Sequence, residues 1–192
     1  MEGGAEQKLC CPIGSEPALM TDYKPLGTEF EIDGLPVYTN GSGENVIIVF
    51  YDIFGYNGGR VKLICDQLAE AGFCVYLPDL YRGDLWSPDE EIGPKTFEWL
   101  KQFKMDAVME DMNKRLLPHA KDKGGKNFGA IGFCWGCTPM WNLGQDEILK
   151  AGVGFHPSLQ TTGLYGQDVL ELTKTLKAPQ MLLTSKHEAA DV

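Results

Sequence analysis

Hydrophobic residues follow two different periods along the chain. Continuous β-branched and aromatic runs are typical of strands that are buried on both faces of a sheet. The alternating segment 28–40, centred on Asp33-Gly34, predicts a β-hairpin. Five continuous apolar runs predict further strands, at residues 45–55, 73–80, 127–133, 151–158 and 178–185.

Between these strands the apolar residues recur at helical spacing, over residues 58–71, 96–119, 137–149 and 164–176. Strands that alternate with helices predict an α/β fold, with a mostly parallel sheet and helices on both faces. Residues 81–95 are rich in Gly, Pro, Asp and Trp, so we expect a long surface loop there.

The length of 192 residues suits one domain, over 21–192, after a lead-in segment of mixed composition at 1–20. With 27 acidic and 17 basic residues the net charge is −10, which disfavours nucleic acid and anionic membranes as partners. No apolar run approaches the roughly 20 residues that span a membrane, and no signal peptide is visible, so we expect a cytoplasmic protein. We expect reduced thiols at all six cysteines, Cys10, Cys11, Cys65, Cys74, Cys134 and Cys137.

Cys134 follows a predicted strand and precedes a predicted helix, inside the pattern Gly132-x-Cys134-x-Gly136. This is the nucleophile-elbow pattern with cysteine in place of serine. The turn is so tight that the flanking glycines are needed to avoid side-chain clashes. The sulfur would then project beside a helix N-terminus, where backbone N–H groups favour a thiolate and a developing oxyanion.

Four segments carry a resemblance to a known family: "YDIFGYNGG" (51–59), "LPDLYRGD" (77–84), "IGFCWG" (131–136) and "APQMLLTS" (178–185). In this order and spacing the chain resembles the dienelactone hydrolase family of α/β-hydrolases. The resemblance implies hydrolysis of a small-molecule ester or lactone through an acyl-cysteine intermediate. It implies no metal and no organic cofactor, and we expect a monomer or weak dimer.

The resemblance also implies roles for individual residues. Cys134 matches the nucleophile, and Asp52 matches an acidic residue that contacts its thiol. The backbone N–H groups of Ile53 and Trp135 match the oxyanion hole. Arg82 lies near the position of an arginine that binds a substrate carboxylate, although its offset from the preceding tyrosine differs. Asp52 could instead cap a loop or helix, and Arg82 could be an ordinary exposed charge.

The triad acid and histidine of the family fall near residue 192. By resemblance Glu188 matches the acid, with Asp191 as the second candidate. The family's histidine lies further on, in a His-Gly-Phe sequence that this chain does not contain. We therefore expect the last strand, the catalytic histidine and the last helix of the family to be missing, and the hydrolase activity to be impaired. His156 is expected at the carboxyl edge of the sheet, where it would line the substrate pocket.

Two other functions are compatible with the sequence. Cys134-Trp-Gly-Cys137 is a C-x-x-C motif at a strand-to-helix turn, as in thiol-disulfide redox proteins, although the flanking glycines are then unexplained. The same spacing predicts a reversible Cys134–Cys137 disulfide under oxidation. A non-catalytic binding fragment is the other alternative, and it rests on the missing histidine alone.

Overall fold

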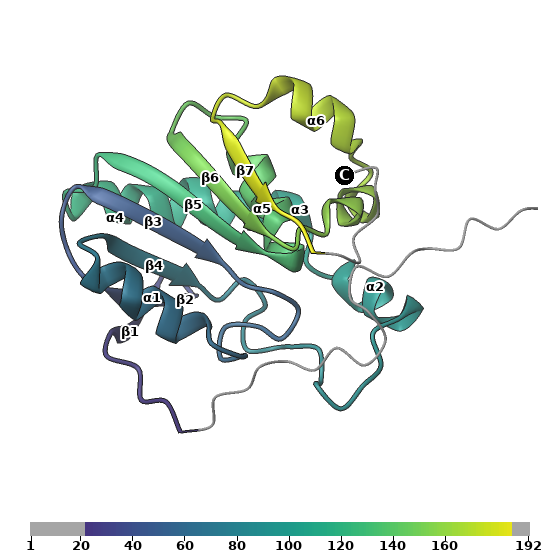
Figure 1. Cartoon of the computed structure of the whole chain (residues 1–192), viewed down its shortest axis with the longest axis horizontal. Helices are drawn as coiled ribbons and strands as arrows, with labels where there is room; N and C mark the ends of the chain where they lie inside the picture. Colours follow the sequence, from purple (N-terminus) through teal and green to yellow (C-terminus); the bar gives the residue numbers. More distant parts are fainter. Residues whose placement is uncertain (1–21, 186–192) are drawn as a thin grey trace, which may run out of the picture.

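The computed structural model describes residues 22–185, so the predicted lead-in segment lies entirely outside the described residues. Seven strands form one sheet in the order β1-β2-β4-β3-β5-β6-β7 (Figure 1). The pairs β1–β2 and β2–β4 are antiparallel, and the other four pairs are parallel. The mostly parallel α/β fold is therefore confirmed. The strands are β1 Thr28–Ile32, β2 Leu35–Asn40, β3 Asn45–Phe50, β4 Cys74–Pro78, β5 Asn127–Phe133, β6 Leu149–Phe155 and β7 Gln180–Leu183.

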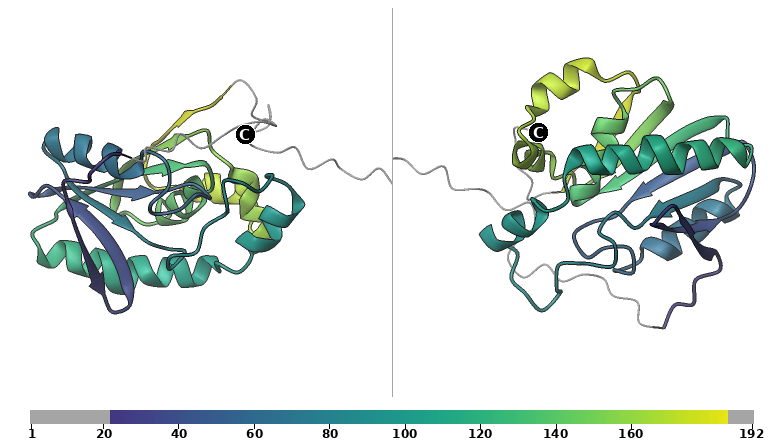
Figure 2. Two further views of the ribbon diagram at one scale, coloured as in Figure 1. Left: turned by 90° about the horizontal axis from the view of Figure 1, so that it is seen from below. Right: turned by 180° about the vertical axis from the view of Figure 1, so that it is seen from behind.

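Helices cover both faces of the sheet. Figure 2 shows α1 on one face and the continuous helical rod of α3, η1 and α4 on the opposite face. The α-helices are α1 Val61–Glu70, α2 Pro94–Leu100, α3 Met105–Glu110, α4 Leu117–Asp122, α5 Cys137–Leu143 and α6 Val169–Thr175. The other helical segments are the π-helical η1 Asp111–Leu116 and the 3₁₀-helical η2 Cys134–Gly136 and η3 Leu159–Tyr165.

The core lies on the central strands, as their apolar runs predict. All five residues of β4 are buried, and β3 is buried from Phe50 back to Val46 except at Ile47. The predicted hairpin is confirmed by β1 and β2. Its turn residues Asp33 and Gly34 have φ values of 46° and 81°, the left-handed pair that a two-residue hairpin of the I′ kind requires.

The predicted strand 45–55 is too long, because β3 ends at Phe50. The next residues turn twice, with Gly55 N–H donating to Asp52 O at 3.2 Å and Gly58 N–H donating to Gly55 O at 3.0 Å. Because of these turns, the helix predicted at 58–71 begins three residues later than predicted, at Val61. The chain therefore leaves the sheet after Phe50, and Asp52 and Ile53 lie in the loop between β3 and α1.

The predicted helix 96–119 is wrong as one continuous helix. It is interrupted between α2 and α3, where Phe103 N–H still bonds to Leu100 O at 3.1 Å in a turn. A second irregularity is η1, the wide π-helical segment that directly precedes α4. Pro118 lies in the first turn of α4 and has no N–H to donate, and a π-helical turn before it accommodates the missing bond.

The predicted helices near the C-terminal third are shorter than their patterns. α5 ends at Leu143, where Gly144 N–H bonds to Met140 O at 2.9 Å, and the chain then turns into β6. The pattern at 164–176 divides between η3 and α6, and Asp168 caps α6 by accepting hydrogen bonds from Leu170 and Glu171 N–H.

No helix within residues 22–185 is both long and apolar enough to cross a membrane.

Candidate functional site

Cys134 occupies the sharp turn between β5 and η2. Its φ is 53°, in the left-handed region that a residue with a side chain rarely adopts. A Cβ at Gly132 would lie 2.8 Å from the Cys137 Cα, and a Cβ at Gly136 would lie 2.4 Å from the Phe50 carbonyl oxygen. Both glycines are therefore required by close backbone packing, as the elbow pattern predicts. The strained residue and its glycines have the geometry of a nucleophile elbow.

Three strand ends meet at this elbow. In the parallel register Phe50 of β3 pairs with Gly132 of β5, and Phe133 of β5 pairs with Phe155 of β6. The carboxyl ends of the three strands therefore share one edge of the sheet. Cys134, Asp52 and His156, each one or two residues beyond its strand, lie together at that edge.

Ser158 contacts the sulfur of Cys134 directly. The Oγ of Ser158 lies 3.1 Å from the Sγ of Cys134, and either atom could be the donor. The Ser158 N–H also donates to the Cys134 carbonyl at 3.1 Å. Both residues are buried, with exposed fractions of 0% for Ser158 and 3% for Cys134. Sequence analysis missed Ser158, although its place just after the strand next to the elbow strand was an available signal.

Asp52 lies at the end of β3, where its Oδ1 accepts a hydrogen bond from Phe54 N–H at 2.9 Å. Burial raises the pKa of the Asp52 carboxyl, and the Phe54 N–H and the charge of His156 only partly offset it. The hydrogen bond to Phe54 is that of a loop cap, which was the alternative role. Asp52 also interacts electrostatically with the side chain of His156.

The candidate oxyanion hole is formed by backbone N–H groups from two elements. Ile53 follows Asp52 in the β3–α1 loop, and Trp135 follows Cys134 in η2. Within residues 22–185 neither N–H group donates to a protein acceptor. Gly136 packs against the Phe50 and Tyr51 carbonyls, so the loop that carries Ile53 lies beside the elbow. This arrangement leaves two donors for an oxygen that develops negative charge.

His156 follows β6 with a φ of 37°, and its N–H donates to Leu183 O at 2.9 Å. Its ring lies 6.4 Å from the ring of Phe133, the residue before Cys134. His119 lies elsewhere, in α4, packed against the rings of Phe30 at 5.1 Å and Tyr76 at 6.1 Å. His156 is therefore the histidine that the described residues bring to the elbow edge.

Residues 32–186 match the dienelactone hydrolase family. The chain belongs to the dienelactone hydrolase family. It is 30% identical over 151 residues to a carboxymethylenebutenolidase homolog of Xenopus tropicalis, covering 76% of this chain and 61% of that protein's length. It is 34% identical over 196 aligned residues to an uncharacterised AIM2 family protein of Schizosaccharomyces pombe, covering 95% and 75% of the two chains. A cold-adapted esterase from an Arctic intertidal metagenomic library has the same fold, with a TM-score of 0.59, 16% identity and coverage of 89% and 91%.

Arg82 is engaged away from the elbow in this member of the dienelactone hydrolase family. Its guanidinium donates to Asp79 O at 2.8 Å and to the Asp111 carboxylate in η1 at 2.7 Å. Arg115 pairs with the same carboxylate at 2.8 Å. Arg82 thereby joins the loop after β4 to the helical rod, which is a structural role.

An aromatic cluster that sequence analysis missed lies beside the elbow. The ring of Tyr81 lies 4.7 Å from that of Trp135 and 4.9 Å from that of Tyr51. The Tyr51 hydroxyl accepts from Tyr81 N–H at 2.7 Å and donates to the buried Asp79 carboxylate at 3.1 Å. The Tyr81 hydroxyl is buried and has no hydrogen-bond partner within the described part of the chain. In the sequence Tyr81 looks like an ordinary core aromatic residue, and no motif distinguishes it.

The side chain of Cys137, in the first turn of α5, packs against the backbone of β5 and β6. Its thiol donates to Gly132 O at 3.3 Å, and it is fully buried against the backbone at Gly154. Neither Cys134 nor Cys137 is in a disulfide. Both sulfurs are almost fully buried, so burial does not distinguish the hydrolase from the redox alternative.

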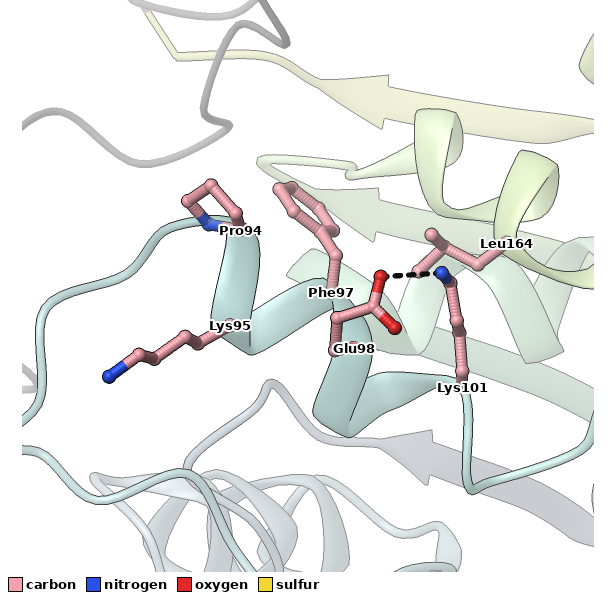
Figure 3. A pocket seen from close by; sticks show the side chains of 6 residues that line it. All are labelled: Pro94, Lys95, Phe97, Glu98, Lys101 and Leu164. Carbon is pink, nitrogen blue, oxygen red and sulfur yellow. Dashed lines mark hydrogen bonds and ion pairs between the residues drawn. The ribbon is translucent and has the colours of Figure 1, made fainter.

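Two pockets differ in their relation to the elbow. A small pocket of about 70 Å³ reaches Asp52 and Phe133, and it is lined by Tyr51, Asp52, Gly58, Gly59, Arg60, Val61, Ile64 and Phe133. A surface pocket of about 480 Å³ lies between α2 and η3 (Figure 3). Figure 3 shows the ion pair of Glu98 and Lys101, 2.6 Å long, at its wall, and the lining residues are Pro94, Lys95, Phe97, Glu98, Lys101 and Leu164. None of the predicted site residues lines this larger pocket.

The predicted triad acids Glu188 and Asp191 lie outside the described residues. Within residues 22–185 no group of three or more His, Cys, Asp and Glu side chains is arranged to hold a metal ion. The described part of the site therefore consists of a thiol, a neighbouring hydroxyl, a carboxylate, an imidazole and two backbone donors.

Proposed function

We propose that this member of the dienelactone hydrolase family cleaves a carboxylic ester or lactone through an acyl-cysteine intermediate on Cys134. The observation that carries the proposal is the strained backbone of Cys134 at the elbow, with φ of 53°, between glycines that tolerate no Cβ. Strain of this kind costs of the order of 1–3 kcal/mol and is found where function requires a fixed geometry. The family match over residues 32–186 supports the same reaction class.

In the proposed reaction the Cys134 thiolate attacks the substrate carbonyl carbon and forms the S–C bond. The carbonyl π electrons move to oxygen, where the N–H groups of Ile53 and Trp135 stabilise the charge. The oxyanion electrons then re-form the carbonyl, the C–O bond to the leaving group breaks, and the released alkoxide takes up a proton from water. An acyl-cysteine remains, which water must attack to regenerate the thiol.

Asp52 contributes through its charge near the thiol in this proposal. A carboxylate disfavours a neighbouring thiolate, so the charge of Asp52 opposes ionisation of Cys134. Arg82 could bind a substrate carboxylate only by leaving the Asp111 carboxylate. We therefore propose that the first substrates to test are small esters without a carboxylate.

We further propose that the 192-residue chain acylates Cys134 but hydrolyses the acyl-enzyme slowly. The chain has no His-Gly-Phe sequence, and Glu188 or Asp191 would act as the triad acid only with a histidine to orient. Triad members act as a unit, so the loss of one lowers turnover by orders of magnitude. A cysteine remains a fair nucleophile without a base, so acylation persists.

The test uses p-nitrophenyl acetate in a stopped-flow assay of nitrophenol release. We expect a burst of about one equivalent, followed by slow turnover, and mass spectrometry should find one acetyl group on the Cys134 peptide. Cys134→Ser should abolish the burst. Absence of both burst and acetyl-Cys134 in the folded wild-type protein would refute the acyl-cysteine reaction.

A second arm of the same assay examines the histidines. His156→Ala should leave the burst amplitude and the slow turnover unchanged, and His119→Ala, in the helical rod, is the control for non-specific effects. Fast multiple turnover that is lost in His156→Ala and kept in His119→Ala would contradict the slow-hydrolysis proposal. It would identify His156 as the base.

A further inference from the structure

Ser158 is joined to Cys134 by two separate contacts. Its hydroxyl oxygen lies 3.1 Å from the sulfur, and its backbone N–H donates to the Cys134 carbonyl at 3.1 Å. Both contacts are buried, so water does not compete for the hydroxyl at this position. A buried hydroxyl requires a hydrogen-bond partner, and the partner available to Ser158 is the proposed nucleophile.

The turn that carries Ser158 is held on two sides. The Ser158 carbonyl accepts from Thr161 N–H at 3.0 Å and from Thr161 Oγ1 at 2.8 Å. The Thr161 hydroxyl also pairs with the Thr138 hydroxyl of α5 at 2.6 Å. On the other side His156 is bonded through its N–H to β7. The hydroxyl of Ser158 is therefore positioned by β6, β7 and the elbow helix together.

We propose that Ser158 is a further catalytic residue, whose hydroxyl donates a hydrogen bond to the Cys134 sulfur and stabilises its thiolate. The inference rests on the proposed function, because it assigns Ser158 to the same nucleophile. In the resting pair the S–H bond can point to the Ser158 oxygen. When the thiol ionises, its S–H electron pair stays on sulfur and the proton passes to solvent water. The hydroxyl then rotates so that its O–H points to the sulfur.

The contact has a second consequence for the attacking sulfur. A hydrogen bond to one side of the sulfur fixes its position relative to the two oxyanion donors. When the sulfur forms its bond to carbon, it loses negative charge and the hydrogen bond weakens. The hydroxyl therefore favours the thiolate before attack and does not remain strongly bonded to the thioester.

Other titratable groups face this pair from the neighbouring elements. Tyr81, after β4, interacts electrostatically with Cys134 and with Asp52, and Asp52, after β3, interacts with His156, after β6. All three are unchanged in a Ser158 variant. A change in the titration of Cys134 on substitution of Ser158 alone therefore reports the hydroxyl.

The test is the pH profile of Cys134 alkylation by iodoacetamide, followed by mass spectrometry in Ser158→Ala. Hydrogen bonds to charged groups are strong enough to change the thiolate fraction about tenfold. A thiolate with a higher pKa is also more nucleophilic, by roughly threefold for such a change. We therefore expect alkylation at pH 7 to slow about threefold, while alkylation above the thiol pKa is equal or faster.

Thr96→Val is the matched control, because it removes another buried hydroxyl, one that accepts a hydrogen bond from Gly93 N–H at 3.0 Å in α2 and belongs to a different turn from Ser158. It should leave the alkylation profile unchanged. Ser158→Thr keeps the hydroxyl and should restore most of the wild-type profile, which gives a second comparison if Ser158→Ala unfolds. Equal profiles in Ser158→Ala and wild type, or equal changes in Ser158→Ala and Thr96→Val, would overturn the inference.

The alkylation assay does not require ester hydrolysis, so the two proposals fail in different ways. A slowed alkylation in Ser158→Ala, together with no acetyl burst in the wild type, would refute the hydrolase proposal and leave the Ser158–Cys134 contact supported. A normal acetyl burst in the wild type, together with unchanged alkylation in Ser158→Ala, would support the hydrolase proposal and refute the role of Ser158.

Discussion

Cys134 and His156 leave two neighbouring parallel strands with the same left-handed backbone conformation. Their φ values are 53° and 37°, and the residues before them, Phe133 and Phe155, pair directly in the sheet. Conformations of this kind persist only when the surrounding structure enforces them. The glycines of the elbow enforce the first, and the hydrogen bond from His156 N–H to β7 supports the second. Two of the four non-glycine residues with positive φ in the described part of the chain thus follow neighbouring strands at one edge of the sheet, where the proposed chemistry takes place.

Cys134 should be the most reactive of the thiols in iodoacetamide mapping near neutral pH. Burial raises the pKa of the Cys65 thiol to about 12, and burial also raises the pKa of Cys74. We expect Cys134 to react more than about a hundredfold faster than Cys65, because the thiolate is the reactive species. Asp52→Asn should raise the Cys134 rate further, since it removes a neighbouring negative charge. Faster labelling of Cys10 or Cys65 would argue against an activated elbow.

Substitution of the elbow glycines should destabilise the protein. In Gly136→Ala the new Cβ would lie 2.4 Å from Phe50 O, and in Gly132→Ala it would lie 2.8 Å from the Cys137 Cα. Both contacts are with backbone, so each substitution should lower the free energy of unfolding by about 1–3 kcal/mol. Gly163→Ala is the control, because nothing lies within 4 Å of its Cβ. Urea unfolding measures the difference, and a Gly136→Ala midpoint equal to that of Gly163→Ala would contradict the packing of the elbow on β3.

Two tyrosines that lie side by side should respond oppositely to loss of their hydroxyls. Tyr51→Phe removes the bonds to Asp79 and to Tyr81 N–H, so it should lower the free energy of unfolding by about 1–3 kcal/mol. Tyr81→Phe removes a buried hydroxyl that has no partner within residues 22–185, so stability should be unchanged or higher. Urea titrations compare the two. A slower acetyl burst in Tyr81→Phe at unchanged stability would show that this hydroxyl contacts the substrate.

Asp66 should make stability depend on acid pH. Burial alone would raise its pKa, but hydrogen bonds from Leu26 N–H and from the Tyr23, Tyr38 and Asn40 side chains lower it. The pKa in the folded state is then below the unfolded value of about 3.9, so the stabilisation is complete above that pH and is lost as pH falls through the folded pKa. Asp66→Asn should cost about 1–3 kcal/mol at pH 7.

The measurement for Asp66 is urea unfolding of wild type and Asp66→Asn at pH 7, 5 and 3. The difference between them should be constant from pH 7 to 5 and should shrink at pH 3. Glu98→Gln, at an exposed i,i+3 ion pair, is the control and should have little effect at any of these pH values. A difference that stays constant down to pH 3 would rule out the proposed linkage.

Arg82→Ala should affect stability more than substrate choice. The side chain is 40% exposed and pairs with Asp111, so we expect a loss of about 0.2–1 kcal/mol. The ratio of burst rates for a neutral ester and a carboxylate-bearing ester should stay the same. If Arg82→Ala selectively slows the acidic ester, the guanidinium leaves Asp111 to bind substrate.

The sheet could be predicted from the sequence because its strands are continuous apolar runs between turn residues. The interruption of the predicted helix 96–119 could not, because Phe97, Leu100 and Phe103 continue the helical period through the turn. In the structure the ring of Phe103 packs against the rings of Tyr81 and Trp99, in the turn between α2 and α3. The helix is therefore interrupted by tertiary packing, and local hydrophobic periodicity gives no sign of this interruption.

The elbow was predictable because its signal is local, with two glycines and a cysteine within five residues. Ser158 was not, because its contact with Cys134 depends on β6 pairing beside β5. The role of Arg82 was also undecided, because the sequence does not show that Asp111 on a distant helix will face it. Asp52 and Ile53 were placed by resemblance, and the parallel register of β3 with β5 explains why they lie near the elbow.

The aromatic cluster beside the elbow gives the protein an optical property. Three of its four tryptophans, Trp86, Trp99 and Trp135, are linked through ring contacts with one another or with Tyr81, and Trp86 and Trp99 lie only 5.8 Å apart. The fourth, Trp141, bonds to Thr173 of α6. We expect indoles this close to exchange excitation energy, and the linked set includes Trp135, which directly follows Cys134 in the chain. Acylation of Cys134 should therefore be visible in the intrinsic fluorescence without any added label.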